Sequence, residues 1–259
     1  MRPHKLRRIG HPALAALVVI ACAHTQSGSL DVAVKQNEEW RRGRTSIYMN
    51  DFGELAHYRA ANAKLPPPAA GENRVVFLGD SITDAWVLPE SFPGKPYVNR
   101  GIGGQTTAQL LVRFHQDVIA LHPKVVVILA GTNDIAGNTG PTTLEDIQAN
   151  FTSMVELARA NGIRVVLSSV LPVHNYTPGS ALTFPLRPPE QIAALNKWLQ
   201  VYAAATGSVY LDYATAMSDA SGLLKQELAP DGLHPTKAGF AIMAPLAEQA
   251  IVKALAGGA

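Results

Sequence analysis

The sequence predicts one α/β domain from about residue 72 to the end of the chain, built as a five-stranded parallel sheet in a three-layer α/β/α arrangement. Two patterns lead to this prediction. Five short apolar runs rich in Val, Ile and Leu alternate along the chain with longer amphipathic stretches. The runs are apolar on both faces, so helices are expected to cover both sides of the sheet.

The expected strands are bounded by Gly, Pro, Asn or Asp, which are residues that end extended structure. These strands cover residues 75–79, 97–101, 125–131, 164–171 and 209–213. The expected helices lie between and after them, at residues 106–121, 144–160, 189–205 and 236–255. Ligands of such a sheet bind at the carboxyl ends of its strands, so the functional residues are expected in the turns that follow.

The first 22 residues are predicted to be a signal peptide ending in a lipobox. A basic start is followed by an apolar run, residues 13–21, that is too short to span a bilayer as a mature helix. Cys22, the only cysteine of the chain, stands where a bacterial lipoprotein carries its lipid. The alternative is simple cleavage after Ala21 or Ala23, because small residues also suit that process.

Both interpretations of the N-terminus place the protein outside the cytoplasm. Ala23 rather than Asp follows Cys22, which favours the outer membrane of a Gram-negative cell and a protein that faces the periplasm. A periplasmic or secreted protein is the alternative. Contact with the membrane is expected only through a lipid anchor at Cys22.

Residues 23–71 are predicted to form a tether and an N-terminal helical extension, ahead of the α/β domain at residues 72–259. The stretch up to residue 45 begins polar and contains Gly and Ser, which is typical of a flexible tether. A helix is expected over residues 51–64 with Asp51 as its N-cap, and the Pro-rich residues 65–71 are expected to end it.

Composition and charge exclude several classes of protein. The formal net charge is +2, but four basic residues lie before residue 9, and without them 18 basic residues face 20 acidic ones. The body of the chain therefore has no electrostatic basis for binding nucleic acid. A single cysteine allows no intrachain disulfide and no cysteine-based metal centre, and we expect neither a cofactor nor a metal ion.

Polar residues follow four of the five expected strands and have the chemistry of nucleophilic acyl transfer. Ser81 follows the first strand and is the candidate nucleophile. His234 is the candidate general base, and Asp231, three residues earlier, can orient its imidazole. The backbone N–H of Ser81, a backbone N–H at Gly103 or Gly104, and the amide of Asn133 are candidate donors to an oxyanion.

These residues resemble the sequence blocks of the SGNH (GDSL) hydrolases. The first block matches residues 79–81 (Gly-Asp-Ser), and the glycine of the second block matches Gly104. The third block matches residues 131–134 (Gly-Thr-Asn-Asp), and the Asp-x-x-His block matches residues 231–234. The resemblance covers about residues 72–250. It implies a flavodoxin-like fold, a metal-independent serine esterase, and Gly104 rather than Gly103 as the oxyanion glycine.

Other candidate residues have structural interpretations. Asp80 is expected to order the turn around Ser81, and Asp134 to order its own loop. Trp86 fits equally the wall of a substrate pocket and an aromatic core. The segment from Val173 to Arg187, which follows the fourth strand and contains His174, is expected to form a lip of the substrate site. Three further histidines are expected to be structural or on the surface: His57, His115 and His122.

The sequence thus predicts an exported serine esterase without fixing its substrate. No long apolar stretch accompanies the blocks, which favours short-acyl esters, including those of O-acetylated glycans. A lipid hydrolase of the lysophospholipase or thioesterase type is one alternative, and a non-catalytic glycan-binding lipoprotein on the same scaffold is another. A nucleotide-binding domain is disfavoured, because Asp80 follows the first strand and its carboxylate would repel phosphate.

Overall fold

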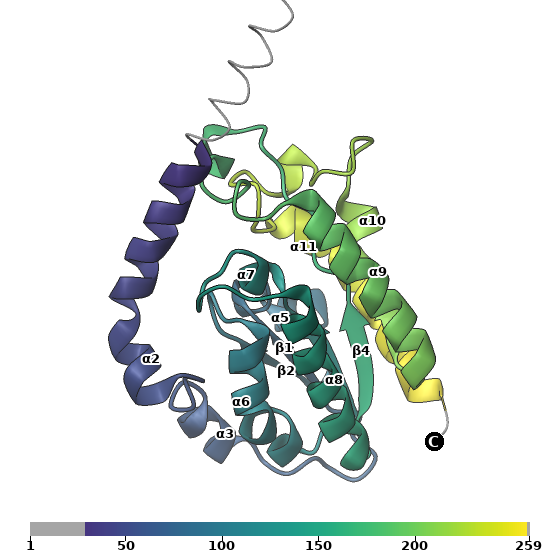
Figure 1. Ribbon diagram of the computed structural model, residues 1–259. Helices are drawn as coiled ribbons and strands as arrows, with labels where there is room; N and C mark the ends of the chain where they lie inside the picture. The colour runs from purple at the N-terminus through teal and green to yellow at the C-terminus, as the bar shows by residue number, and fades with distance from the viewer. Residues whose placement is uncertain (1–28, 258–259) are drawn as a thin grey trace, which may run out of the picture.

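The computed structural model describes residues 29–257, within which five strands form a single parallel sheet (Figure 1). The strands are β1 (Val75–Gly79), β2 (Tyr97–Gly101), β3 (Val125–Leu129), β4 (Arg164–Ser168) and β5 (Val209–Leu211). Their order across the sheet is β2-β1-β3-β4-β5, which is the flavodoxin order. The predicted fold class is confirmed, whereas the predicted signal peptide and Cys22 lie outside the described residues.

Helices cover both faces of the sheet, as the two-sided apolar strands require. One face packs against α6 (Thr107–Asp117), α8 (Leu144–Ala160) and α9 (Pro189–Thr206). The other face packs against α11 (Lys237–Ala256), with α5 (Leu88–Ser91) and α10 (Tyr213–Met217) beside it. Alternate residues of each strand supply the two cores, for example Val76 and Leu78 to the first and Phe77 to the second.

The register of the sheet brings the turns after the strands to one edge. Gly79 at the end of β1 pairs with Gly101 of β2 and with Leu129 of β3. Two short helices begin just beyond this edge, α4 (Ser81–Asp84) after β1 and α7 (Thr132–Ile135) after β3. Because β1 and β3 flank the point where the strand order reverses, the fold places its ligand crevice between these two turns.

The last three strands end two or three residues earlier than the apolar runs predict. The runs at 125–131, 164–171 and 209–213 continue past the ladders, which stop at Leu129, Ser168 and Leu211. Tyr213 begins α10 instead, because the Asp212 carboxylate accepts a hydrogen bond from the Thr215 N–H and starts a helix there. Hydropathy alone cannot distinguish a buried strand from the buried turn that follows it.

The predicted tether is wrong for residues 29–43, which are helical throughout and are called the N-terminal helix below. The helix runs along one side of the domain (Figure 1). Ala33 is only 1% exposed, and the Asn37 side chain donates a hydrogen bond of 2.7 Å to the Ala136 carbonyl. Tertiary packing of this kind fixes a segment whose polar, Gly- and Ser-bearing start suggests a free linker.

The single helix expected over residues 51–64 is also wrong. Helix α2 (Thr45–Asp51) ends where that helix should begin, and α3 covers only Arg59–Lys64. The Asp51 carboxylate accepts hydrogen bonds from the Leu55 and Ala56 N–H groups, so it caps the turn after α2. Glu54 has a positive φ of 53°, a left-handed conformation that cannot continue a helix.

The remaining short elements are 3₁₀ turns, and the C-terminal helix closes the fold. The turns are η1 (Ile119–Leu121), η2 (Pro178–Ser180) and η3 (Gln226–Leu228). Helix α11 is the one helix among the described residues that is long and apolar enough to cross a membrane. It packs on β3, β4 and β5 through Met243, Ala247 and Ile251, as a core helix does.

Candidate active site

Ser81, His234 and Asp231 form a continuous hydrogen-bonded line at the carboxyl edge of the sheet. The Ser81 Oγ lies 2.9 Å from His234 Nε2, and His234 Nδ1 lies 2.6 Å from Asp231 Oδ2. The sequence separates Ser81 from His234 by 153 residues, and the fold joins them. This geometry allows the imidazole to accept the serine proton while the carboxylate holds the other ring nitrogen.

The turn that presents Ser81 is fixed by its neighbours. The buried carboxylate of Asp80 accepts a hydrogen bond of 3.0 Å from the Ile82 N–H and caps α4, whose first residue is Ser81. Gly79 is required before it, because a Cβ there would lie 2.6 Å from the Leu129 carbonyl oxygen. Burial raises the pKa of Asp80 to about 6, although the Ile82 N–H and the charge of His234 act in the opposite direction.

The loop that carries Asp231 and His234 is held by the same carboxylate that meets the imidazole. Asp231 Oδ1 accepts hydrogen bonds from the Leu233 N–H at 3.0 Å and the His234 N–H at 2.8 Å. Partial burial acts to raise the pKa of Asp231, but the hydrogen bonds from His234 and Leu233 outweigh it and lower that pKa. Gly232 adopts φ 81° and leaves no room for a Cβ, which would lie 2.5 Å from the Ser180 Cβ.

Gly104 and Asn133 lie beside Ser81 on one cleft. Gly104 has φ 78°, and its carbonyl accepts a hydrogen bond of 3.0 Å from the Asn138 side chain. Asn133 is 3% exposed, and its Nδ2 donates to the Gln105 carbonyl at 3.0 Å and to Asp80 Oδ2 at 3.3 Å. The predicted candidates for nucleophile, base, orienting acid and oxyanion donors therefore come together in one place.

Arg187 is a residue of this site that no pattern in the sequence predicts. It is 5% exposed, and its Nη2 donates a hydrogen bond of 3.2 Å to Asn133 Oδ1. Its Nε donates to Thr132 Oγ1, and its Nη1 to the Thr183 carbonyl. Desolvation lowers the pKa of Arg187 to about 10, partly offset by the charges of Asp80 and Asp231. The guanidinium therefore holds the Asn133 amide with its oxygen toward Arg187 and its NH₂ group toward Asp80 and the Gln105 carbonyl.

Asp134 orders its loop, as the sequence predicts. Its carboxylate accepts hydrogen bonds from the Thr107 backbone N–H and the Thr107 hydroxyl, which joins the turn after β3 to the start of α6. Burial raises the pKa of Asp134 to about 6, while the Thr107 hydrogen bonds act to lower it. The carboxylate has no contact with Ser81 or His234 among its hydrogen bonds.

Trp86 and the four other candidate histidines lie outside the group formed by Ser81, His234 and Asp231. Trp86 is 3% exposed and stacks on Phe240, as its core interpretation predicts, and it also lines a pocket with Phe240 and Pro235 that is separate from the cleft of Ser81. His174 is buried, with its Nε2 2.6 Å from the Ala229 carbonyl, and it supports the loop before Asp231. His57 contacts the Tyr58 ring, His115 lies in the last turn of α6, and His122 ends η1.

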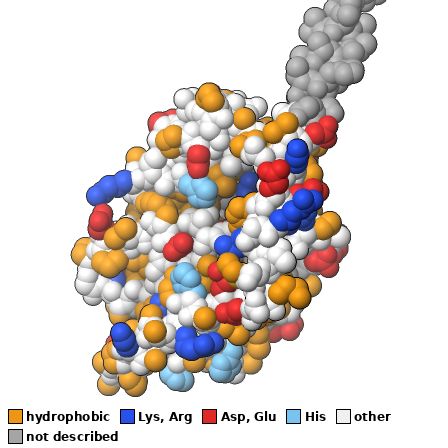
Figure 2. Space-filling view, turned by 90° about the vertical axis from the view of Figure 1, so that its left-hand side faces the viewer, with side chains coloured by type: hydrophobic (Ala, Val, Ile, Leu, Met, Phe, Trp, Pro, Cys, Tyr) orange, Lys and Arg blue, Asp and Glu red, His pale blue; other side chains and the backbone are white. Residues whose placement is uncertain are grey.

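The cleft around Ser81 has a volume of about 400 Å³ and two walls. The segment from Val173 to Arg187 forms one wall through Leu182, Thr183, Leu186 and Arg187, in agreement with its predicted place as a lip. The N-terminal helix forms the other wall, which the sequence analysis did not anticipate. Figure 2 views the side that carries this helix, and acidic and basic side chains are mixed over it without a continuous patch of one sign.

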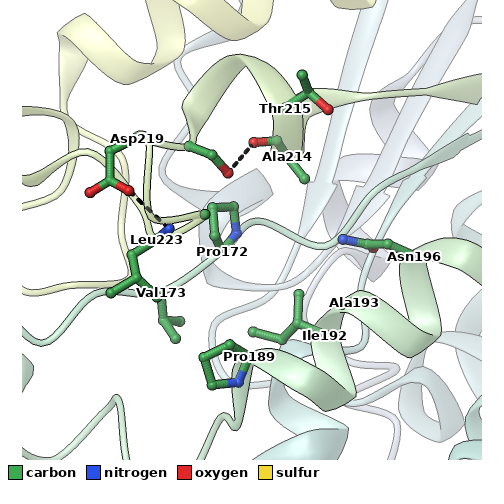
Figure 3. A pocket seen from close by; sticks show the side chains of 12 residues that line it. Pro172, Val173, Pro189, Ile192, Ala193, Asn196, Ala214, Thr215, Asp219 and Leu223 are labelled. Atoms are coloured by element: carbon green, nitrogen blue, oxygen red, sulfur yellow. Dashed lines mark hydrogen bonds between the residues drawn. The ribbon is translucent and has the colours of Figure 1, made fainter.

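A second pocket of about 380 Å³ lies between α9 and α10, away from Ser81 (Figure 3). Its polar side chains already have partners. Asn196 bonds with the Val170 backbone, and Asp219 accepts from the Tyr176 hydroxyl and the Leu223 N–H. Within residues 29–257, no group of three or more His, Cys, Asp or Glu side chains could hold a metal ion.

The fold and the hydrogen-bonded serine, histidine and aspartate define a serine hydrolase of the α/β class. The sequence model of the GDSL-like Lipase/Acylhydrolase family matches residues 77–242, and the chain belongs to this family, whose members hydrolyse esters. A GDSL-like lipase from Bacteroides thetaiotaomicron has a similar structure, with 42% identity and a TM-score of 0.72, covering 79% of this chain and 100% of that one.

Two curated relatives add information about activity and location. An acetylxylan esterase from Geobacillus stearothermophilus is 28% identical, over 66% of this chain and 90% of that protein. An uncharacterized lipoprotein from Bacillus subtilis is 35% identical over 79 residues, and the chain spans only 32% of its length. The chain is thus an ester hydrolase by family, and its substrate is not fixed by these relatives.

Proposed function

We propose that the chain is an exported serine esterase that hydrolyses carboxylic esters through an acyl-enzyme on Ser81. The observation that carries this proposal is the line of hydrogen bonds from Asp231 through His234 to Ser81, which ends at an open cleft. A serine hydroxyl becomes a nucleophile only when a base removes its proton, and His234 Nε2 lies within reach of that proton. Asp231 stabilises the imidazolium that results.

The reaction proceeds in two steps, acylation of Ser81 by the ester and hydrolysis of the acyl-enzyme by water. Ser81 Oγ bonds to the carbonyl carbon of the ester while His234 takes its proton. The bond to the alcohol oxygen then breaks, and His234 returns the proton to the leaving alcohol. Water next attacks the acyl carbon while His234 takes its proton. The acyl–Oγ bond then breaks, and His234 returns that proton to Ser81 Oγ, which releases the acid and restores the serine.

The oxyanion of each tetrahedral intermediate is bound by the backbone N–H groups of Ser81 and Gly104 and by the Asn133 amide. The Asn133 amide is oriented for this role, since Arg187 donates a hydrogen bond to its oxygen and the NH₂ group therefore points away from Arg187. The weaker of its two present contacts is the one to Asp80 Oδ2 at 3.3 Å. An oxyanion can replace that contact during the reaction.

Asn133→Ala is expected to lower kcat by roughly 10²–10³-fold with little change in KM, because the amide meets the charge only in the transition state. Arg187→Met is expected to lower kcat in wild type but to add little in the Asn133→Ala background, since it acts through that amide. Both variants are measured on enzyme titrated with a fluorophosphonate, beside a thermal melt. A lower melting temperature with wild-type kcat would remove Asn133 from the site.

The substrate is proposed to be a short-acyl ester, with O-acetylated glycans favoured. The acetylxylan esterase relative supports this class, and the cleft wall carries amides and a guanidinium at Asn133, Asn138 and Arg187. A lysophospholipid or acyl thioester would need a longer apolar channel. A non-catalytic glycan-binding protein on this scaffold would not require the base and the orienting acid that this chain retains.

Hydrolysis of p-nitrophenyl esters from acetate to palmitate tests the proposal with the wild-type protein. We expect kcat/KM to be highest for acetate and to fall with chain length. A maximum at long chains would favour the lipid hydrolase. No turnover of any ester, with a folded protein, would favour the glycan-binding alternative.

Export through a lipidated Cys22 is part of the proposal, and the similarity to a lipoprotein from Bacillus subtilis supports it. In a bacterial host fed a fatty-acid analogue, the wild-type protein is expected to be labelled and to sediment with membranes. Cys22→Ser is expected to remove the label. Release of an unlabelled wild-type protein in soluble form would instead indicate simple cleavage after Ala21 or Ala23.

A further inference from the structure

The N-terminal helix is anchored to the segment that carries Asn133. The Asn37 side chain donates to the Ala136 carbonyl at 2.7 Å, and Arg41 Nη1 donates to the Gly137 carbonyl at 3.4 Å. Both acceptors belong to the turn that follows α7. The family match begins only at residue 77, so this helix lies outside the matched region. It is nevertheless built into the cleft.

One face of the N-terminal helix is turned to the cleft of Ser81. Ala33, Gln36, Asn37 and Trp40 occupy positions i, i+3, i+4 and i+7, which share one face of a helix, and all four line the cavity. The Trp40 ring covers Gly104, where a Cβ would lie only 2.8 Å from the ring carbon Cζ2. Trp40 is still 38% exposed, and it lines the cleft of Ser81.

The polar neighbour of Trp40 is available for hydrogen bonding. Gln36 lies one turn earlier on the same face, is exposed, and has no hydrogen-bond partner among the described residues. The Arg44 guanidinium lies over the Trp40 ring, 5.3 Å from its centroid, so the exposed remainder of the indole is the flat apolar surface beside the donors and acceptors of the Gln36 amide. A sugar ring has the matching pair, a face of C–H groups and a rim of hydroxyls.

We propose that Trp40 and Gln36 form a subsite that binds the sugar ring of an O-acylated glycan while its ester lies at Ser81. The inference rests on the proposed esterase function. It assigns a binding subsite and two contacting residues to the alcohol part of the substrate. An acyl chain fits this wall less well, since Gln36 and Asn37 interrupt the apolar surface around Trp40. The N-terminal helix is then a determinant of specificity.

The test compares two substrates in each variant, acetylated xylo-oligosaccharides and p-nitrophenyl acetate. The measured quantity is the ratio of kcat/KM for the glycan ester to kcat/KM for the aryl ester. Trp40→Ala is expected to lower this ratio by roughly fivefold to tenfold, mainly through KM for the glycan ester. Gln36→Ala is expected to lower it by a smaller factor, and because Gln36 is exposed this variant should fold normally.

Val32→Ala is the matched control, because Val32 is an exposed residue of the same helix that does not line the cleft. It should leave the ratio at the wild-type value. An unchanged ratio in both Trp40→Ala and Gln36→Ala overturns the inference, and so does a gain of activity on longer acyl esters in Trp40→Ala. Failure of the wild-type protein to hydrolyse either substrate would contradict the esterase function instead, so the two failures are distinguishable.

Discussion

Ser81→Ala is expected to lower kcat for ester hydrolysis by a factor of about 10³ or more. The hydroxyl is the atom that bonds to the acyl carbon, and no other group of the cleft can replace it. The stability of the protein should change little, because the turn is held by other residues. Asp80 caps α4, and the Gly79 backbone packs closely against the Leu129 carbonyl. Initial rates with p-nitrophenyl acetate and a thermal melt measure both effects.

A serine-directed fluorophosphonate gives a readout that does not depend on the substrate. It is expected to label the wild-type protein once per chain and to leave Ser81→Ala unlabelled. Ser221→Ala is the control, since Ser221 is an exposed serine outside the cleft. It should keep full labelling and full activity. Wild-type turnover by a folded Ser81→Ala protein would disprove the acyl-enzyme mechanism.

The sequence predicts the sheet and the principal residues of the site for a physical reason. Buried parallel strands need continuous apolar runs, and the turns at their carboxyl ends are the places where polar residues are free to serve a ligand. Ser81 and Asn133 lie just after strands, and the loop of Asp231 and His234 lies between η3 and α11, after the last strand. Their positions can therefore be inferred from order along the chain, and the parallel register then brings them to one edge.

The walls of the cleft could not be inferred in the same way. The N-terminal helix is placed by contacts that join residues nearly 100 positions apart, such as Asn37 with Ala136. No local pattern records such a contact, and the polar start of the stretch predicts a tether instead. Arg187 is similar, because its importance lies in the bond to Asn133 Oδ1, 54 residues away. A buried arginine without a neighbouring acid in the sequence gives no signal of its own.

Two carboxylates lie near Ser81, and only one of them is expected to orient the base. Asp231 Oδ2 contacts His234 Nδ1 at 2.6 Å, whereas Asp80 contacts the Ile82 N–H and Asn133. Both carboxylates are close enough to influence the reaction through their charge, and Asp80 stands next to Ser81 in the chain. The substitutions Asp231→Asn and Asp80→Asn distinguish the carboxylate that orients the His234 imidazole from one that only lies near Ser81.

Asp231→Asn is expected to lower kcat by roughly 10²–10⁴-fold with little change in KM. The backbone N–H groups of Leu233 and His234 both donate to Asp231 Oδ1, so the oxygen of the introduced amide must occupy that position. Its NH₂ group then faces His234 Nδ1 and forces that nitrogen to accept. The proton moves to Nε2, which can no longer take the proton of Ser81.

Asp80→Asn should cause a smaller loss, because the introduced amide can still accept from the Ile82 N–H and cap α4. Its NH₂ group would meet the NH₂ of Asn133, which disturbs the oxyanion donor but leaves the base in its active tautomer. Values of kcat on titrated enzyme for both variants, with thermal melts to show that each is folded, decide between the two carboxylates. A greater loss in Asp80→Asn than in Asp231→Asn would assign the orienting role to Asp80.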